Sequence, residues 1–173
     1  MTWAGSRSPP TGGVAPFRVV ISEPGVPVCG SHYNTGLIAI SPDGTRVAYA
    51  SSRAGGGERL VMWERDRGGA HEIPGPTLNN YDPCFSPDGR TLSFVGPGIL
   101  RTTGPDVTPT EVWGGVSVMK GMAWLGGDLI CAPHATGGLV SIAVGGERPP
   151  IKLTVPDFSG GEISHRYPDP LPD

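Results

Sequence analysis

The sequence repeats one tetrapeptide, Ser41-Pro42-Asp43-Gly44, as Ser86-Pro87-Asp88-Gly89, 45 residues further along the chain. Each copy follows an apolar residue, Ile40 or Phe85, and precedes a segment in which apolar and polar residues alternate. In a tight turn, proline presets φ at the second position, aspartate tolerates the third, and glycine takes the left-handed fourth. Each copy therefore predicts a β-hairpin, in which two strands flank one tight turn.

The strand after each turn is expected to have an apolar face. Val47 and Tyr49 follow the first turn, and Leu92 and Phe94 take the same places after the second. Because side chains alternate between the two faces of a strand, each pair lies on one face. Three tryptophans recur near predicted strands and are expected in the core between repeats: Trp63, Trp113 and Trp124.

Two degenerate copies extend the repeat. In residues 122–128, Gly126-Gly127 replaces Pro-Asp at the bend, and Trp124 falls 39 residues after Phe85. A fourth copy begins at Leu171-Pro172-Asp173, 85 residues beyond the second. A period of about 40–45 residues with four strands per repeat is typical of the blades of a β-propeller.

Each of the first three repeats also holds two further strand-length apolar blocks: residues 59–64 and 70–73, 98–103 and 110–113, and 138–144 and 150–153. No window of about eleven or more residues shows the 3.6-residue apolar period of a helix. The sequence therefore predicts an all-β fold, a partial β-propeller of about three four-stranded blades.

Two segments, SPDGTRVAYAS (residues 41–51) and FSPDGRTLSFV (residues 85–95), resemble the WD-like repeats of TolB-type six-bladed propellers. A narrower resemblance, to propellers attached to bacterial serine/threonine protein kinases, is carried by residues 17–21, 121–124 and 164–168. In such proteins a cytoplasmic kinase domain, a membrane span and a Pro-rich linker precede the propeller, which implies an extracytoplasmic location. This sequence contains neither kinase nor span, so the resemblance implies no kinase activity here.

The same resemblance implies a domain organisation. Residues 1–16 look like the end of a Pro/Gly-rich linker, and residues 17–173 are expected to form the partial propeller. Its blade motifs are expected near residues 37–74, 82–113 and 121–153, with a fourth motif that begins at residues 163–173. A six-bladed ring of this period needs roughly 250 residues, so the terminal blades would expose apolar faces. We therefore expect the chain to self-associate or to pair with further blades.

Charge and motif content exclude several functions. The net charge is −3 and no basic run occurs, which argues against binding to nucleic acid or to an anionic membrane. No apolar stretch could span a bilayer, so we expect no direct membrane contact in this segment. A Gly-x-Ser-x-Gly nucleophile motif and a phosphate-binding loop are absent, and Cys29, Cys84 and Cys131 lack metal-binding spacing. We expect no catalytic residue, cofactor or metal site.

Polar residues near the motifs allow two interpretations. Asp43 and Asp88 hold equivalent turn positions, which favours turn-capping carboxylates over metal ligands. A functional interpretation places the segment 165–167 at a central channel or ligand mouth, whereas a structural one makes it a strand that packs its tyrosine between blades. Two short segments form the candidate interaction surface: Asn79, Asn80 and Tyr81, and His165, Arg166 and Tyr167.

Two functions stay open on the sequence. The first is a non-catalytic interaction or sensor propeller, from a kinase-linked or a TolB-like protein. The second is the propeller of a prolyl-oligopeptidase-like serine peptidase, whose catalytic module would lie outside this sequence. An adjoining α/β-hydrolase module would favour the second, and further blades alone would favour the first. In both cases the ligand and the partner stay unknown, and this chain itself is expected not to be an enzyme.

Overall fold

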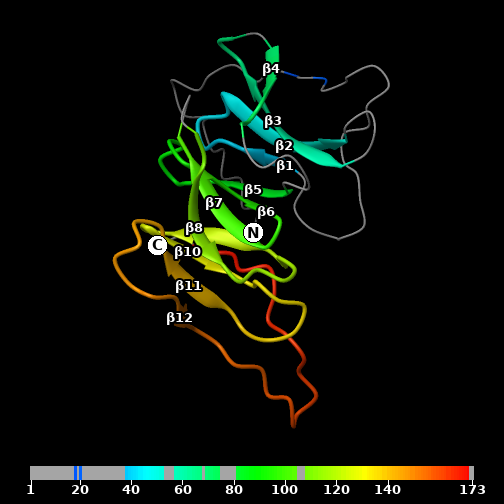
Figure 1. The fold of residues 1–173 in the computed structure, drawn as a ribbon, viewed down its shortest axis with the longest axis vertical. Helices are drawn as coiled ribbons and strands as arrows, with labels where there is room; N and C mark the ends of the chain where they lie inside the picture. The colour runs from blue at the N-terminus through cyan, green and yellow to red at the C-terminus, as the bar shows by residue number, and fades with distance from the viewer. Residues whose placement is uncertain are drawn as a thin grey trace, which may run out of the picture.

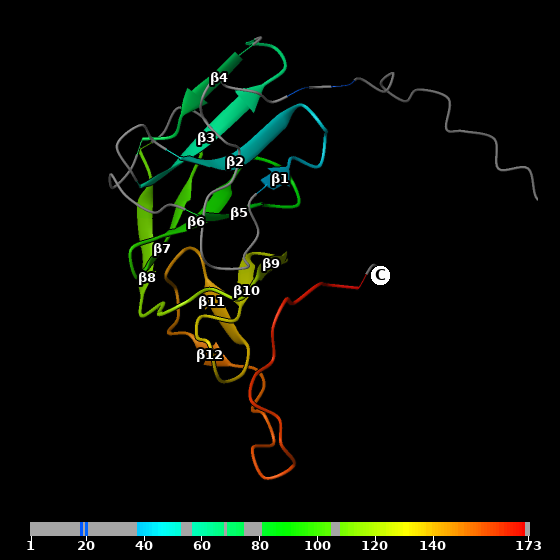
Figure 2. The same cartoon turned by 90° about the vertical axis from the view of Figure 1, so that its right-hand side faces the viewer.

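The structure, a computed structural model, describes residues 18, 20, 38–52, 57–67, 69–74, 81–104 and 108–171. In these residues twelve strands form three four-stranded antiparallel sheets, and no helix is present that could cross a membrane (Figure 1). The sheets follow one another along the long axis of the molecule, and the view turned by 90° shows the same succession (Figure 2). The prediction of an all-β fold with three four-stranded units is confirmed.

Strand order follows the chain in every sheet. The first sheet contains β1 (Ile38–Ile40), β2 (Arg46–Ser52), β3 (Glu58–Glu64) and β4 (Gly69–Glu72). The second sheet contains β5 (Tyr81–Phe85), β6 (Leu92–Gly96), β7 (Ile99–Thr103) and β8 (Thr110–Gly114). The third sheet contains β9 (Met122–Leu125), β10 (Asp128–Cys131), β11 (Val140–Ala143) and β12 (Ile151–Lys152).

Both Ser-Pro-Asp-Gly motifs form the tight turn between the first two strands of a sheet. The Gly44 amide donates a hydrogen bond to the Ser41 carbonyl at 2.8 Å, and the Gly89 amide donates to the Ser86 carbonyl at 2.8 Å. Both glycines have a φ of +69°. Glycine adopts this left-handed conformation without the steric strain that a Cβ would cause.

The aspartate of each motif caps its own turn. Asp43 Oδ1 accepts hydrogen bonds from the Ser41 hydroxyl at 2.6 Å and from the Thr45 amide at 3.0 Å. These bonds, the hydroxyl first, lower the pKa of Asp43 to about 2. Asp88 Oδ1 accepts from the Ser86 hydroxyl at 2.6 Å, and this bond lowers the pKa of Asp88 in the same way.

The two turns also meet where the first and second sheets pack together. The Arg46 guanidinium donates a hydrogen bond to the Gly89 carbonyl and lies 5.3 Å from the centre of the Phe85 ring, a cation–π contact. A Cβ built on Gly89 would lie 3.4 Å from Pro42 Cδ. The repeated motif therefore closes each hairpin and also joins neighbouring sheets.

Cross-strand pairing identifies one equivalent position in the first strand of each sheet, which we call the anchor position: Ile40 opposite Val47, Phe85 opposite Leu92, and Trp124 opposite Leu129. Phe85 packs between the first and second sheets, and Trp124 packs between the second and third. Both side chains are only 9% exposed. Burying a side chain of this kind stabilises the fold by roughly 1.5–3 kcal/mol.

The boundary between the second and third sheets holds both described cysteines. Trp124 Nε1 donates a hydrogen bond to the Cys84 carbonyl at 3.3 Å, and Cys131 is fully buried. Both thiols are free, and burial raises the pKa of Cys84 to about 11 and that of Cys131 to about 12. Trp113 also packs here, whereas Trp63 packs on the face of the first sheet that points away from the second sheet, so its place between repeats stays a prediction.

One left-handed residue recurs near the first strand of three successive repeats: Asp82 (φ +52°), Gly121 (φ +100°) and Tyr167 (φ +51°). The anchor position follows three residues later in the second and third sheets. By the same count, Pro170 takes the anchor position of the fourth repeat. Gly121 is also needed for a close approach, because a Cβ there would lie 2.8 Å from Tyr167 Cα.

The fourth repeat starts like the others but forms no strand in the described residues. Contrary to the strand interpretation of residues 165–167, this segment forms no strand: Ser164 just before it makes an isolated parallel bridge with Gly137, and the amides of His165 and Tyr167 each donate one backbone hydrogen bond. A strand needs a ladder of hydrogen bonds, and Pro168 and Pro170 have no amide hydrogen to donate to one.

We predict that Gly89→Ala lowers the free energy of unfolding by about 1–2 kcal/mol, because an L-residue is strained in the left-handed conformation. Gly127→Ala is the matched control. Gly127 lies in the corresponding turn of the third sheet, outside the left-handed region and with nothing within 4 Å of an added Cβ. Chemical denaturation measures both variants. A loss below about 0.5 kcal/mol for Gly89→Ala, the scatter of harmless surface changes, would contradict the assigned turn.

Candidate functional site

The structure places the two candidate polar segments at one position of the repeat but in different surroundings. Tyr81 begins β5 and is half-buried against the cluster between the second and third sheets, whereas Asn79 and Asn80 lie outside the described residues. His165 and Arg166 lie beyond the third sheet. Tyr81 and Arg166 each directly precede a left-handed residue, so they hold equivalent positions.

A loop of residues 154–167 protrudes beyond the third sheet, at the lower end of the molecule in both ribbon views (Figures 1 and 2). We call it the protruding loop. Just before it, the Leu153 amide donates a hydrogen bond to the Leu139 carbonyl at 2.8 Å. Near its end, the His165 amide donates to the Gly137 carbonyl at 2.9 Å. Both ends of the loop are therefore fixed to one short segment ahead of β11.

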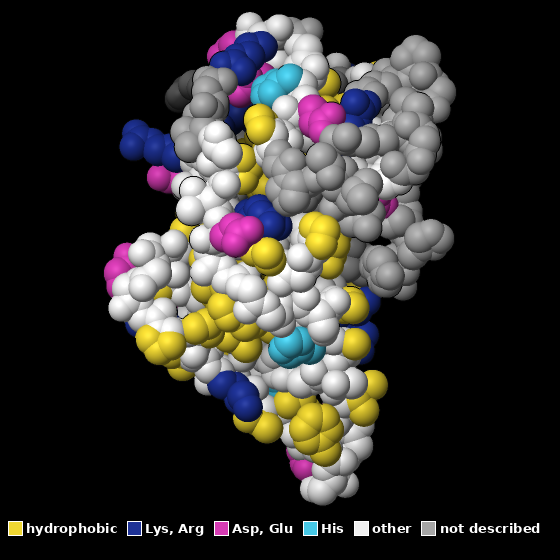
Figure 3. Space-filling model, in the orientation of Figure 1, with side chains coloured by type: hydrophobic (Ala, Val, Ile, Leu, Met, Phe, Trp, Pro, Cys, Tyr) yellow, Lys and Arg dark blue, Asp and Glu magenta, His cyan; other side chains and the backbone are white. Residues whose placement is uncertain are grey.

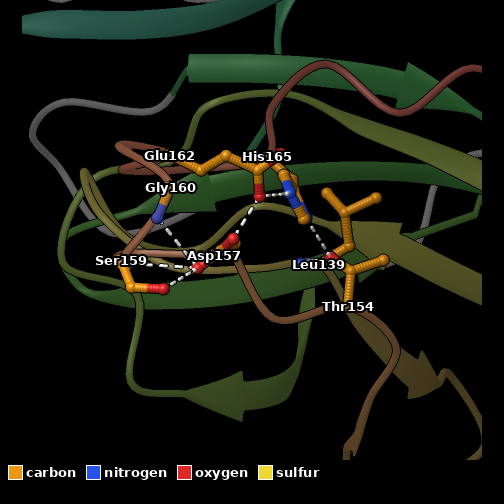
Figure 4. Close-up of polar contacts among 7 residues, drawn as sticks. All are labelled: Leu139, Thr154, Asp157, Ser159, Gly160, Glu162 and His165. Carbon is orange, nitrogen blue, oxygen red and sulfur yellow. Dashed lines mark hydrogen bonds and ion pairs between the residues drawn. The ribbon is translucent and has the colours of Figure 1, made fainter.

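The tip of the protruding loop is closed by a single carboxylate (Figure 4). Asp157 Oδ1 accepts hydrogen bonds from the Ser159 hydroxyl at 2.6 Å, the Ser159 amide at 3.0 Å and the Gly160 amide at 3.0 Å. These bonds, the serine hydroxyl first, lower the pKa of Asp157. The Glu162 amide donates to the Asp157 carbonyl at 3.0 Å and completes the turn.

His165 joins the two sides of the loop near its base (Figure 4). Its Nδ1 lies 2.7 Å from Thr154 Oγ1, and its Nε2 lies 3.3 Å from Glu162 Oε2. Because a carboxylate only accepts, Nε2 must carry the hydrogen, and in the neutral ring Nδ1 then accepts from the Thr154 hydroxyl. Thr154 Oγ1 in turn accepts from the Leu139 amide at 2.9 Å.

Glu162 connects this base to the tip. Its Oε2 also accepts a hydrogen bond from the Asp157 amide at 2.7 Å. That bond first, and the bond from His165 second, lower the pKa of Glu162. One carboxylate oxygen therefore holds tip and base together, and the whole loop is internally hydrogen-bonded.

The remaining two candidate residues fix the end of the loop. Arg166 Nη2 donates a hydrogen bond to the Ala135 carbonyl at 2.9 Å, and its Nε donates to Ser164 Oγ at 2.6 Å. The Tyr167 amide donates to the Lys120 carbonyl at 2.9 Å, while the side chain of Tyr167 is exposed. Arg166 and Tyr167 thus position the protruding loop against two separate segments of the chain.

The protruding loop presents three apolar side chains to solvent. Val155, Phe158 and Ile163 are between 61% and 66% exposed. Figure 3 shows hydrophobic side chains on the surface at this lower end of the molecule. Exposed apolar side chains on a fixed surface loop are typical of a site that binds another protein.

The sequence motifs pointed to only part of this site. The pattern around His165 singled out the end of the loop, but Thr154, Asp157 and Glu162 belong to no recognisable motif. Among the described residues, no group of three His, Cys, Asp or Glu side chains could hold a metal ion. Asp43 and Asp88 cap their turns, as their hydrogen bonds show.

No family model and no curated protein matches this sequence. Solved structures do match its fold. A TolB-like protein of Agrobacterium tumefaciens superposes with a TM-score of 0.57 at 19% identity, over 70% of this chain and 49% of that one. The chain is a partial β-propeller. TolB of Acinetobacter baumannii matches with a TM-score of 0.54 at 13% identity, over 70% of this chain and 32% of that one.

A protein other than TolB is equally similar. A chain of a nidogen/laminin complex matches with a TM-score of 0.54 at 10% identity, over 70% of this chain and 50% of that one. This partial propeller therefore spans half or less of the length of these matched chains. At such low identities the likeness shows the fold alone.

We predict that His165→Ala loosens the protruding loop. Hydrogen exchange at the amides of Asp157 and Leu139 should accelerate roughly two- to twelvefold, because losing a side-chain hydrogen bond removes roughly 0.5–1.5 kcal/mol of protection. His71→Ala, a histidine exposed on β4, is the matched control and should leave both amides unchanged. Equal exchange in wild type and His165→Ala would show that the imidazole does not hold the loop.

Proposed function

We propose that this chain is a non-catalytic β-propeller module that binds a partner protein through the protruding loop. The observation that carries the proposal is the presence, on one loop, of an internal hydrogen-bonded frame and three exposed apolar side chains. A loop that is already ordered loses little conformational entropy when it binds. The sheets behind it supply the rigid support.

The expected partner surface is apolar at its centre and polar at its rim, like most specific interfaces. Phe158, at the tip, is the side chain best suited to be the central contact, because aromatic anchors supply much of the binding energy in such interfaces. Asp157 and Glu162 are used inside the loop. Arg166, at its exposed end, supplies polar contacts at the rim.

The parent protein is part of the same proposal. The resemblance of residues 41–51 and 85–95 to TolB-type repeats supports a TolB-like origin. The resemblance of residues 121–124 and 164–168 to kinase-attached propellers supports a link to a serine/threonine kinase. In either setting the module would serve in protein interaction or in sensing.

We predict that Phe158→Ser weakens binding of the partner protein. Tagged chains expressed in the source cells are isolated by affinity, and the proteins that accompany them are quantified by mass spectrometry. At least one protein enriched with wild type should fall about tenfold, since losing a central aromatic contact costs 1.4 kcal/mol or more. Ile151→Ser, an exposed apolar residue on β12, is the control and should retain it. The proposal would be contradicted if wild type, Phe158→Ser and Ile151→Ser all retained the same proteins in equal amounts.

We also predict that the purified chain transfers no phosphate from ATP and hydrolyses no peptide. Hydroxyl–imidazole pairs do occur among the described residues: Ser117 Oγ lies 3.0 Å from His134 Nδ1, and Thr154 Oγ1 lies 2.7 Å from His165 Nδ1. Nucleophilic catalysis also needs a group that orients the base and donors that stabilise the oxyanion. Turnover of either substrate that disappears in Ser117→Ala or His165→Ala would overturn the non-catalytic assignment.

A further inference from the structure

An apolar groove of about 290 Å³ lies on the face of the third sheet that points away from the second. Ile130 points into this face, because its neighbours in β10, Leu129 and Cys131, pack toward the second sheet. The other principal lining residues come from the third sheet, its flanking segments and the start of the fourth repeat: Leu125, Leu139, Leu153, Pro168 and Pro170.

The following sheet covers the corresponding face elsewhere in the molecule. Leu60 in the first sheet, Leu100 in the second and Leu139 in the third occupy equivalent positions. The equivalence follows from counting residue pairs along the ladder between the second and third strands of each sheet. Leu60 and Leu100 are fully buried against the next sheet. Leu139 instead lines the open groove.

In the two covered faces, the contact is made by the anchor position of the next sheet, Phe85 or Trp124. Pro170 holds this position over the third sheet and is too small to replace an aromatic ring. No hydrogen bond among the described residues fixes Pro168, Asp169 or Pro170 to the sheet. A small residue therefore stands beside the open groove, at the position where a large one packs in the second and third sheets.

The first sheet carries an anchor residue that is itself uncovered. Ile40 is 64% exposed, although it pairs with Val47 as Phe85 pairs with Leu92. Ile38, two residues earlier on the same face, is 53% exposed. On this face of the first sheet, the apolar residues of the longer strands β2 and β3 are buried. The uncovered apolar surface therefore belongs to β1.

We propose that two copies of this chain associate head to tail, with Ile40 of one copy in the groove on the third sheet of the other. The β1 strand of the incoming copy would take the place of residues 168–170. Each copy carries one uncovered anchor and one open groove, so a two-fold pair satisfies both contacts at once.

A second copy fits this groove better than an unrelated protein does. The two uncovered surfaces use the same repeat positions that already pack together twice within this chain, at Phe85 and at Trp124. The complementary surfaces are thus both present on one molecule. This inference is separate from the proposed function, because β1 and the groove lie outside the protruding loop.

Sedimentation equilibrium of the full chain tests the association. Wild type should have about twice the monomer mass of 17.9 kDa. Ile40→Asp and Leu125→Asp should each raise the dissociation constant at least about tenfold, because a charge would be buried in an apolar contact. Val20→Asp, at another exposed apolar residue, is the control and should leave the constant unchanged. Ile40 and Leu125 are 64% and 58% exposed in the single chain, so both variants should fold, which thermal unfolding checks.

An equimolar mixture of Ile40→Asp and Leu125→Asp tests the orientation. The first variant keeps an intact groove and the second keeps an intact Ile40, so mixed pairs with one good contact should form and appear in native mass spectra. If either variant unfolds, Ile40→Ser and Leu125→Ser replace them. Wild type that stays monomeric at millimolar concentration, association unaffected by Ile40→Asp, or a mixture without mixed pairs would each overturn the proposal. These outcomes leave the binding role of the protruding loop untouched, because Phe158 takes no part in the contact.

Discussion

Each boundary between sheets in this chain depends on one apolar side chain that extends from the first strand of a sheet onto the sheet before it. Phe85 does this at the first boundary and Trp124 at the second, and both are almost completely buried. The turn that follows Phe85 adds the contact between Arg46 and Gly89. Without these contacts, the apolar faces that meet at each boundary would be exposed to water. The order of the sheets therefore follows from the repetition of one position.

The fold could be predicted from the sequence because its determinant is local. A proline that presets φ, a carboxylate that caps and a glycine that accepts a left-handed conformation act within four residues, so the motif specifies its hairpin without help from distant parts of the chain. Properties that depend on which face meets which neighbour were harder to predict. Trp63 is expected between repeats and packs on the face of the first sheet that points away from the second, but local sequence does not say which neighbour that face meets. The third sheet could be predicted despite its altered turn, since short apolar blocks still stand on both sides of Gly126-Gly127.

The candidate site was predicted only at its end. His165, Arg166 and Tyr167 formed a visible polar cluster, but the frame of the protruding loop is built from Thr154, eleven residues earlier, and from the backbone at Leu139. Such contacts exist only after the third sheet has formed, so no spacing in the sequence announces them. The same limit applies to the fourth repeat. Its motif and its left-handed Tyr167 are both present, but strand formation also requires a hydrogen-bonding neighbour, which local sequence cannot supply.

The restriction of contacts to adjacent sheets also has a consequence for how such a gene can change. Each sheet meets its neighbours through the same few positions, so an unequal crossover between two repeats would remove or add a whole sheet and still join compatible faces. The length of the array could then drift without a new interface having to evolve. Substitutions at the anchor position would act differently, because they decide whether a boundary is closed within the chain or stays open to another molecule. Residue 170 is a proline, whereas its counterparts at the two closed boundaries, Phe85 and Trp124, are aromatic.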